Sequence, residues 1–462
     1  MAASTAACSF DRSGLPAGDG GSDDAVVLPD GPSGIDGGLD AGPDGGDPDA
    51  SVDAETCTTA CVGNGYRDCD AAGAIVPCSV GCMDDATGPR CLALVPSNGA
   101  DRDDVEDTSA LFIPAGAIVI DTDTGEIYDT DGQGAVYRQA GEGLVGDEND
   151  LNPTRFTVLS DSVSELAVAS LTLGPGSYVL PIGTRALIIL SAGDVFLAGR
   201  IDLGGGHCDN DDDTCPGAGG GYGQSSEGPA EGCGPGGAGF AGSGDETGGG
   251  GGGLGQAGAP GGNGGGGNEG GLAGSIADCP GATLIPLVGG SGGGAGGNAT
   301  GGTGGGGAGA LQITSLTSVS VTTVGSVFAI IYAGGAPGHE GHGSSGGGGG
   351  GAGGGILLEA PTVVLTGAVL AANGGSGGDG REHDDGGYGG ETTQPTPGGG
   401  TGNSRGGNSG ALIPPTAGAG PTDGTGGGGA GSGIIRLNTY EPLINVASVL
   451  SPTPSTGAIT TE

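Results

Sequence analysis

Residues 326–355 read SVFAIIYAGGAPGHEGHGSSGGGGGGAGGG, an apolar run that leads directly into a tract of glycine. The same order recurs where residues 194–203 (DVFLAGRIDL) precede a longer tract, and where residues 356–372 precede the tract at 373–433. Short apolar runs bounded by glycine and proline are typical of β-strands. The units differ in length, so there is no strict repeat period. We therefore predict an all-β protein, either a small β-sandwich or a short parallel β stack, with long glycine-rich insertions.

The glycine tracts allow two interpretations. Glycine loses more backbone freedom on ordering than any other residue, so tracts such as 248–253 are compatible with disordered linkers. Alternatively, extended helices with three residues per turn can pack side by side and hydrogen-bond to one another where no Cβ intervenes. Strands return after each tract, which holds the tract ends together and lowers the cost of ordering. We favour a polyglycine-helix bundle and keep disordered insertions as the alternative. The runs do not keep the collagen frame, and no tandem calcium-binding nonapeptides occur.

The composition restricts both the core and the chemistry. The 462 residues include 119 Gly and 28 Pro but only six Phe, eight Tyr and no Trp, which predicts a core that is either small or built from several short strands. The formal net charge is −43, and every basic residue is Arg. A surface this acidic repels phosphate backbones, so we expect no nucleic-acid partner. The lack of Lys excludes a Walker lysine, a Schiff-base lysine and a lysine general base.

The cysteines indicate an oxidising compartment. The chain contains eleven Cys in a sequence poor in core-forming residues, a pattern typical of exported, disulfide-stabilised proteins. We predict that ten of them form disulfides: Cys57, Cys61, Cys69, Cys78, Cys82, Cys91, Cys208, Cys215, Cys233 and Cys279. The eleventh, Cys8, ends the small-residue run MAASTAAC and resembles the lipidated cysteine of a bacterial lipoprotein signal, although the apolar region of such a signal is missing. A start codon assigned too far downstream would explain the missing region, and an unpaired cysteine in a tail is the alternative.

The chain divides into six predicted regions. In order they are a remnant lipoprotein-type signal (1–8), an acidic disordered tether (9–56), a six-cysteine module (57–91), a β-rich region (92–203), strands alternating with glycine-rich tracts (204–450) and a C-terminal tail (451–462). The tether is predicted to be disordered because it combines low hydrophobicity with high net charge. In the cysteine module, disulfides are favoured over zinc because the segment contains no His.

Motifs associated with hydrolases occur in an unfavourable context. The pattern Gly-x-Ser-x-Gly, which forms the nucleophile elbow of α/β-hydrolases, occurs at four serines: Ser291, Ser345, Ser376 and Ser404. Repeated copies inside glycine-rich tracts are expected by chance. The run Asp123-Thr124-Gly125 matches one half of an aspartic protease site, but no second copy follows, so we predict a turn. We predict no catalytic residues and no enzymatic activity.

Three clusters carry candidate metal ligands. Asp209, Asp211 and Asp213 offer carboxylates at alternate positions, as at the start of an EF-hand loop, but the glycine and the bidentate glutamate of that loop are absent. We expect a weak, non-EF-hand Ca²⁺ site at most, and no other cofactor. The run 339–342 (HEGH) lacks the i, i+4 histidine spacing of zincins. A second polar run lies at 382–385 (EHDD). We interpret both runs as solvated loops, with adventitious metal binding as the alternative.

The layout resembles the glycine-rich exported lipoproteins of gliding and predatory soil bacteria. The shared features are the Ala-Ala-Cys start, the Asp/Gly-rich tether, a cysteine module ending at Arg90-Cys91, the runs at 95–98 (VPSN) and 118–125 (IVIDTDTG), and β segments ending in glycine tracts. Such proteins are often labelled PE-PGRS-like by composition, but this chain has no PE domain. The tracts are also similar to the glycine-rich extracellular region of certain receptor tyrosine kinases, where threefold glycine helices are inserted into a β-sandwich.

The resemblance implies a location at the outer membrane or extracellular surface of a bacterium, with attachment to the outer membrane through a lipid on Cys8. We expect a non-enzymatic structural or adhesive cell-surface protein with an unidentified surface or extracellular partner. The alternatives are a hydrolase with a site built from loops and a calcium-stabilised binding module.

Overall fold

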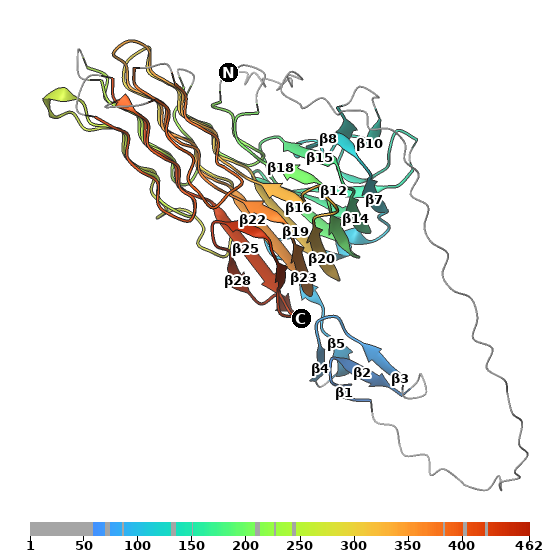
Figure 1. Cartoon of the computed structure of the whole chain (residues 1–462). Helices are drawn as coiled ribbons and strands as arrows, with labels where there is room; N and C mark the ends of the chain where they lie inside the picture. The colour runs from blue at the N-terminus through green and yellow to red at the C-terminus, as the bar shows by residue number, and fades with distance from the viewer. Residues whose placement is uncertain are drawn as a thin grey trace, which may run out of the picture.

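The computed structural model is nearly all β (Figure 1). It describes residues 59–69, 74–85, 87–130, 135–149, 151–207, 213–225, 228–242, 246–381, 384–400, 404–420 and 424–462. The predicted signal, the predicted tether, Cys57 and Cys208 lie outside the described residues.

The main body is a parallel β-helix with three faces. The consecutive strands β13 (Val163–Val168), β14 (Ser170–Leu173) and β15 (Ser177–Ile182) belong to three different sheets, and β16 (Ala186–Ser191) then pairs in parallel with β13. The same cycle repeats through β28 (Ser455–Gly457), so each turn of the chain adds one strand to each sheet. Parallel pairing of this kind requires a crossover between paired strands, and here the other two faces supply it.

The three sheets differ in size. Sheet 1 has six strands: β7 (Ala110–Ile113), β14, β17 (Val195–Leu197), β20 (Ser318–Thr322), β23 (Thr362–Thr366) and β26 (Ile444–Val446). Sheet 2 has eight: β8 (Gly116–Asp121), β9 (Ile127–Asp129), β10 (Val136–Arg138), β15, β18 (Arg200–Asp202), β21 (Ile330–Tyr332), β24 (Val369–Ala371) and β27 (Val449–Ser451). Sheet 3 also has eight: β11 (Gly143–Val145), β12 (Thr154–Ser160), β13, β16, β19 (Ala310–Ser315), β22 (Gly355–Ala360), β25 (Ile434–Thr439) and β28.

The core consists of aliphatic side chains stacked in register along each sheet. In sheet 3 one such ladder joins buried residues of five successive strands: Leu166, Ile189, Ile313, Leu358 and Leu437. The equivalent ladder of sheet 1 contains Leu111, Leu171, Val195, Val319 and Val363. Alternate residues of a strand point to the same face, so short strands with two or three aliphatic residues fill the interior of each turn.

The all-β prediction is therefore confirmed, in its parallel-stack form, but the sheets are large and not small. The core is built from many short strands, which is the second of the two expectations drawn from the scarcity of aromatic residues. A β-helix of narrow cross-section needs only Leu, Ile, Val and Ala, and these recur in one continuous cluster from Leu111 to Leu437.

A buried arginine holds the first turns together. The turn predicted at Asp123-Thr124-Gly125 connects β8 to β9, with Gly125 at φ +74°. The guanidinium of Arg138 is fully buried against Phe156 and donates hydrogen bonds to four backbone carbonyls, those of Gly125, Gln139, Gly141 and Gly143. Burial lowers the pKa of Arg138 to about 10, so the group stays charged at neutral pH.

The segment 96–105, here called the strap, covers the outer face of sheet 3. The backbone N–H and the hydroxyl of Ser97 donate to the fully buried carboxylate of Glu359 at 2.9 and 2.7 Å. The strap ends in a short 3-10 helix, η2 (Arg102–Val105), next to the buried Glu165 of β13. Burial, together with the nearby charge of Asp104, raises the pKa of Glu165 to about 8.

The cysteine-rich segment forms two small antiparallel sheets. The first contains β1 (Cys61–Val62), β2 (Gly65–Asp68) and β3 (Ala74–Pro77), and the second contains β4 (Cys82–Asp85) and β5 (Gly88–Cys91). Disulfides join Cys61 to Cys82 and Cys78 to Cys91, and Cys69 is also disulfide-bonded. Beyond the module, β6 (Leu94–Val95) pairs with β29 (Thr460–Thr461), and Val80 packs in one cluster with Leu94 and Ile459. Within the described residues, no helix is both long enough and apolar enough to cross a membrane.

Candidate functional site

The glycine tracts leave the β-helix at one position in its cycle, after a strand of sheet 2 and before a strand of sheet 3. Tracts follow β18, β21 and β24 and lead back to β19, β22 and β25. Figure 1 shows them as long, nearly parallel traces that project from the strands as one bundle. This glycine bundle is the most unusual surface of the molecule and therefore the first candidate for its function.

Hydrogen bonding inside the bundle has a period of three residues. The six successive amides of residues 248–253 donate, in order, to the carbonyls of Gly262, Gly347, Gly237, Ala259, Gly350 and Gly234. Positions 248 and 251 thus bond to one neighbouring segment, 249 and 252 to a second, and 250 and 253 to a third. Residues 346–351 behave in the same way. A threefold extended helix that points each amide at a different neighbour explains this pattern, as predicted for the polyglycine interpretation.

The close packing of the segments requires glycine. A Cβ added to Gly348 would lie 1.8 Å from the carbonyl oxygen of Thr303, and one added to Gly427 would lie 1.8 Å from that of Gly348. Larger residues are therefore excluded from these two positions. Small side chains do occur where the lattice leaves space, and Ala308, Ala336, Ala352 and Ala430 are fully buried.

The four serines of the Gly-x-Ser-x-Gly motifs lie inside this lattice. Ser291, Ser345, Ser376 and Ser404 are all buried. The Ser291 hydroxyl accepts from the Gly234 amide at 2.8 Å, and the Ser376 hydroxyl donates to the Pro397 carbonyl at 2.7 Å. These hydroxyls satisfy backbone groups of neighbouring segments, so the motif has a packing explanation in this fold.

A disulfide and a pocket mark the base of the bundle. Cys233 pairs with Cys279 across 46 residues of the first tract, and Cys215 is also disulfide-bonded. Beside the Cys233–Cys279 bridge lies a pocket of about 420 Å³, lined by apolar residues that include Leu254, Ile276 and Ile434.

A polar cluster ties the bundle to sheet 2. Arg200 forms ion pairs with Asp202 at 2.9 Å and with Glu391 of the third tract, and its guanidinium lies 5.0 Å from the ring centre of Tyr332. The Tyr332 hydroxyl donates to the Gly389 carbonyl at 2.6 Å. Burial opposes the ionisation of Asp202, but the hydrogen bond and charge of His207 and the charge of Arg200 outweigh it and hold the pKa of that carboxyl well below its ordinary value.

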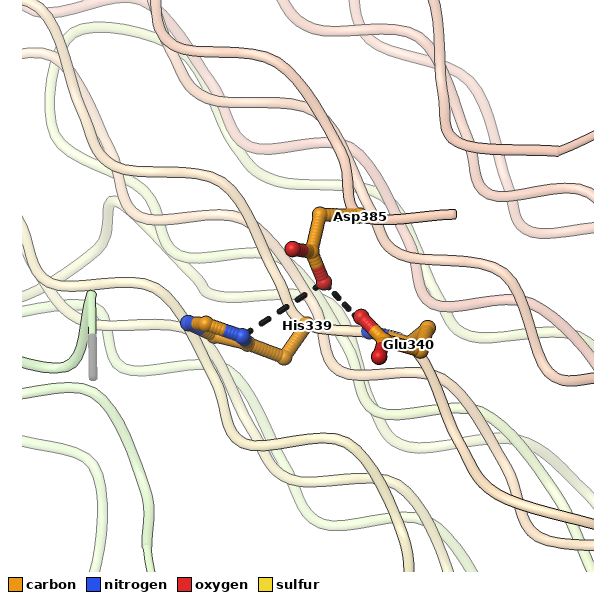
Figure 2. Close-up of side chains that lie close together, drawn as sticks. All are labelled: His339, Glu340 and Asp385. Atoms are coloured by element: carbon orange, nitrogen blue, oxygen red, sulfur yellow. Dashed lines mark hydrogen bonds and ion pairs between the residues drawn. The ribbon is translucent and has the colours of Figure 1, made fainter. Parts of the chain in front are cut away.

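A second polar cluster joins two tracts. Figure 2 shows His339, Glu340 and Asp385 with their polar atoms turned toward one another. One ligand atom from each lies within 4.8 Å of the others. We interpreted the two runs that contain these residues as separate solvated loops; the register of the bundle brings them together.

The predicted calcium ligands are only partly described. Asp209 and Asp211 lie outside the described residues, so that site stays a prediction. Asp213 lies beside His339: its backbone N–H donates to the His339 Nε2 at 3.1 Å, and its carboxylate lies 3.6 Å from the same nitrogen. Its side chain also accepts from the Tyr388 hydroxyl.

None of the family models, curated proteins or solved structures compared with the chain matches it. The interpretation of function therefore depends on the geometry alone.

Proposed function

We propose that the protein is an exported, non-enzymatic structural or adhesive protein of a bacterial cell surface, in which the β-helix carries the glycine bundle as a stiff projecting element. The observation that supports this most directly is the threefold hydrogen bonding of the bundle. A stack of segments joined through their backbones on several sides is suited to resisting deformation and offers few side chains for chemistry.

The position of the large apolar side chains favours adhesion. Leu254 and Leu284 are buried at the base of the bundle, in one cluster with Leu357 and Ile434. Other large apolar side chains of the tracts lie on the surface of the bundle, including Phe240 (47% exposed), Leu272 (72%) and Ile413 (57%). Exposed apolar groups on a rigid scaffold lose little entropy on contact with another surface, which favours association. The partner is a surface or an extracellular molecule that offers apolar contact.

The disulfides support export. Cys61–Cys82, Cys78–Cys91 and Cys233–Cys279 are stable only where thiols are oxidised. Attachment would follow from lipidation of Cys8, with the acidic segment 9–56 as the tether to the outer membrane. This arrangement would hold the bundle away from the membrane.

The proposal is tested on cells that express the full chain with a surface epitope. We expect antibody to label intact cells and a deletion strain to attach less well to solid supports. A triple variant, Phe240→Ser, Leu272→Ser and Ile413→Ser, should reduce attachment while remaining on the surface. The matched control is Phe328→Ser, which alters an exposed aromatic residue (60% exposed) outside the glycine tracts. Labelling that requires cell lysis, or normal attachment by both the deletion strain and the triple variant, would contradict the proposal.

A further inference from the structure

The cluster at His339, Glu340 and Asp385 brings one imidazole and two carboxylates from two different tracts into contact. His339 and Glu340 belong to the tract after β21, and Asp385 belongs to the tract after β24. The His339 Nδ1 lies 3.4 Å from the Asp385 Oδ1, and the Glu340 amide donates to the same oxygen at 3.0 Å (Figure 2). His339 and Glu340 are adjacent in sequence, so the packing of one tract against the other is what brings Asp385 to them.

The three groups have the chemistry of a metal site. Imidazole with carboxylates is a donor set typical of first-row divalent ions such as Zn²⁺, whereas Ca²⁺ and Mg²⁺ prefer oxygen alone. Ligand atoms of a tetrahedral zinc site lie roughly 3.4 Å apart, given metal–ligand distances of about 2.1 Å. The present separations, all within 4.8 Å, therefore need only a small contraction of partly exposed side chains.

A third carboxylate, that of Asp213, lies next to the other ring nitrogen of His339. The Asp213 Oδ2 is 3.6 Å from the His339 Nε2, on the side of the ring opposite Asp385. A ligating histidine usually donates its other ring N–H to a carboxylate, which orients the ring and raises its basicity. In this structure the His339 Nε2 accepts from the Asp213 backbone N–H at 3.1 Å. With an ion on Nδ1 the ring proton moves to Nε2, which then donates to the Asp213 carboxylate in place of that bond, after a small rotation of the Asp213 side chain. Asp213 belongs to a third segment, in the tract after β18.

The electrostatics of the cluster favour a cation. A carboxylate oxygen of Glu340 lies within 4.8 Å of one of Asp385. Among the ion pairs of the described residues, the partner of Asp385 is His339, and no arginine neutralises the pair. Two adjacent carboxylates repel each other unless they share a proton or a cation, and a divalent ion removes that repulsion.

We propose that His339, Glu340 and Asp385 bind one divalent transition-metal ion of the Zn²⁺ class, with Asp213 as the positioning residue, and that the ion clips the tracts after β21 and β24 together. The inference does not depend on an adhesive function, because a metal clip would stiffen the bundle whatever the bundle contacts.

The test is Zn²⁺ binding to the full chain, measured by competition with a chromophoric chelator in excess Mg²⁺, which occupies the weak acidic sites of so charged a protein. We expect one equivalent of Zn²⁺ to bind with high affinity. His339→Gln and Asp385→Asn should each weaken it at least tenfold. The matched control is His207→Gln, which removes a histidine that also lies 3.4 Å from a carboxylate, that of Asp202. This control should bind as the wild type does.

Hydrogen exchange supplies an independent readout. Zn²⁺ should slow exchange of amides near 339–341 and 384–386 in the wild type but not in His339→Gln. Unchanged protection of the β-helix amides in each variant would show that the fold is intact. Equal Zn²⁺ binding by His339→Gln and wild type, or Ca²⁺ binding as tight as Zn²⁺ binding, would overturn the assignment.

Discussion

The β-helix and the glycine bundle bury backbone in opposite ways. In the β-helix, hydrogen bonds run between strands in one direction, and aliphatic ladders such as Ile313–Leu358–Leu437 fill the space between the sheets. In the bundle, the amides of residues 248–253 reach three different neighbours, and almost no side chain separates the segments. The first region is stabilised mainly by apolar burial and the second mainly by hydrogen bonds and close backbone contact.

This difference predicts different sensitivities. An apolar core loses stability when a side chain becomes smaller, because a cavity forms. A lattice of glycine loses stability when a side chain becomes larger, because the backbone carbonyls around it cannot move without breaking their own hydrogen bonds. The bundle also bears a large entropic cost for ordering glycine, so constraints on its unfolded state matter more there.

The largest effect is expected from the Cys233–Cys279 disulfide. Replacing both cysteines with serine releases a loop of 46 residues, and the chain-entropy relation gives a loss of about 4 kcal/mol. We expect hydrogen exchange to accelerate in the bundle, while the ladders of the β-helix stay protected. If the β-helix lost protection to the same extent, the two regions would unfold as one unit and the comparison would fail.

The next largest effect is expected from truncation in the core. Leu358→Ala removes a fully buried side chain from the middle of the sheet 3 ladder, and such changes cost about 2–5 kcal/mol. Chemical denaturation monitored by circular dichroism measures the change. Val446→Ala, in the last strand of sheet 1 at 54% exposure, serves as the control and should alter stability by less than about 0.5 kcal/mol. Equal effects at both positions would show that the ladder is not the source of stability.

Much of this fold is predictable from local sequence. Runs such as 356–372 carry the alternation and glycine punctuation of strands, and tracts such as 346–351 have no side chains to pack in any other way than backbone to backbone. The parallel stack and the polyglycine helices can therefore both be predicted from the sequence. The hydroxyls of Ser291 and Ser376 bond to backbone groups of neighbouring segments, while their non-catalytic character stays a prediction.

Other features depend on information that the sequence does not carry locally. Each turn of the β-helix contains three strands, but β18, β21 and β24 have three residues each. A strand of three residues is too short for its alternation of buried and exposed side chains to be recognised in the sequence. Aligning the segments 186–203, 310–333 and 355–372 with one another would reveal the repeated three-strand turn. The contact between His339 and Asp385 depends on the register between two tracts, and no pattern within either tract encodes it.

A third prediction concerns the lattice. Gly348→Ala places a Cβ 1.8 Å from the Thr303 carbonyl oxygen, and such overpacking costs about 1–3 kcal/mol. The control is Gly228→Ala, where the added Cβ would meet no atom within 4 Å; there the loss of glycine freedom in the unfolded chain should leave stability unchanged or slightly raised. Thermal unfolding of both variants measures the difference. A bundle of disordered linkers would tolerate both changes equally.

The smallest effect per step of the variable is expected from pH, at no more than about 1.4 kcal/mol for each pH unit, and it should arise in the β-helix. Glu165 is buried beneath the strap, and its pKa of about 8 exceeds its ordinary value of 4.5. The folded protein thus binds a proton that the unfolded chain releases between these two values. The contribution of Glu165 to the free energy of unfolding is therefore fully present below about pH 4.5. It is lost as pH rises toward 8, by up to about 1.4 kcal/mol per pH unit.

Glu165→Gln should remove this slope, because a neutral amide mimics the protonated acid at every pH. The measurement is the free energy of unfolding between pH 5 and pH 8.5, compared with that of Glu148→Gln, which changes an exposed glutamate in the same part of the chain. The control should keep the wild-type slope. Hydrogen-exchange protection corrected for intrinsic rates should fall with pH beneath the strap before it falls in the bundle. An unchanged slope in Glu165→Gln would show that the pH response originates elsewhere, with the histidines of the bundle as the next groups to replace.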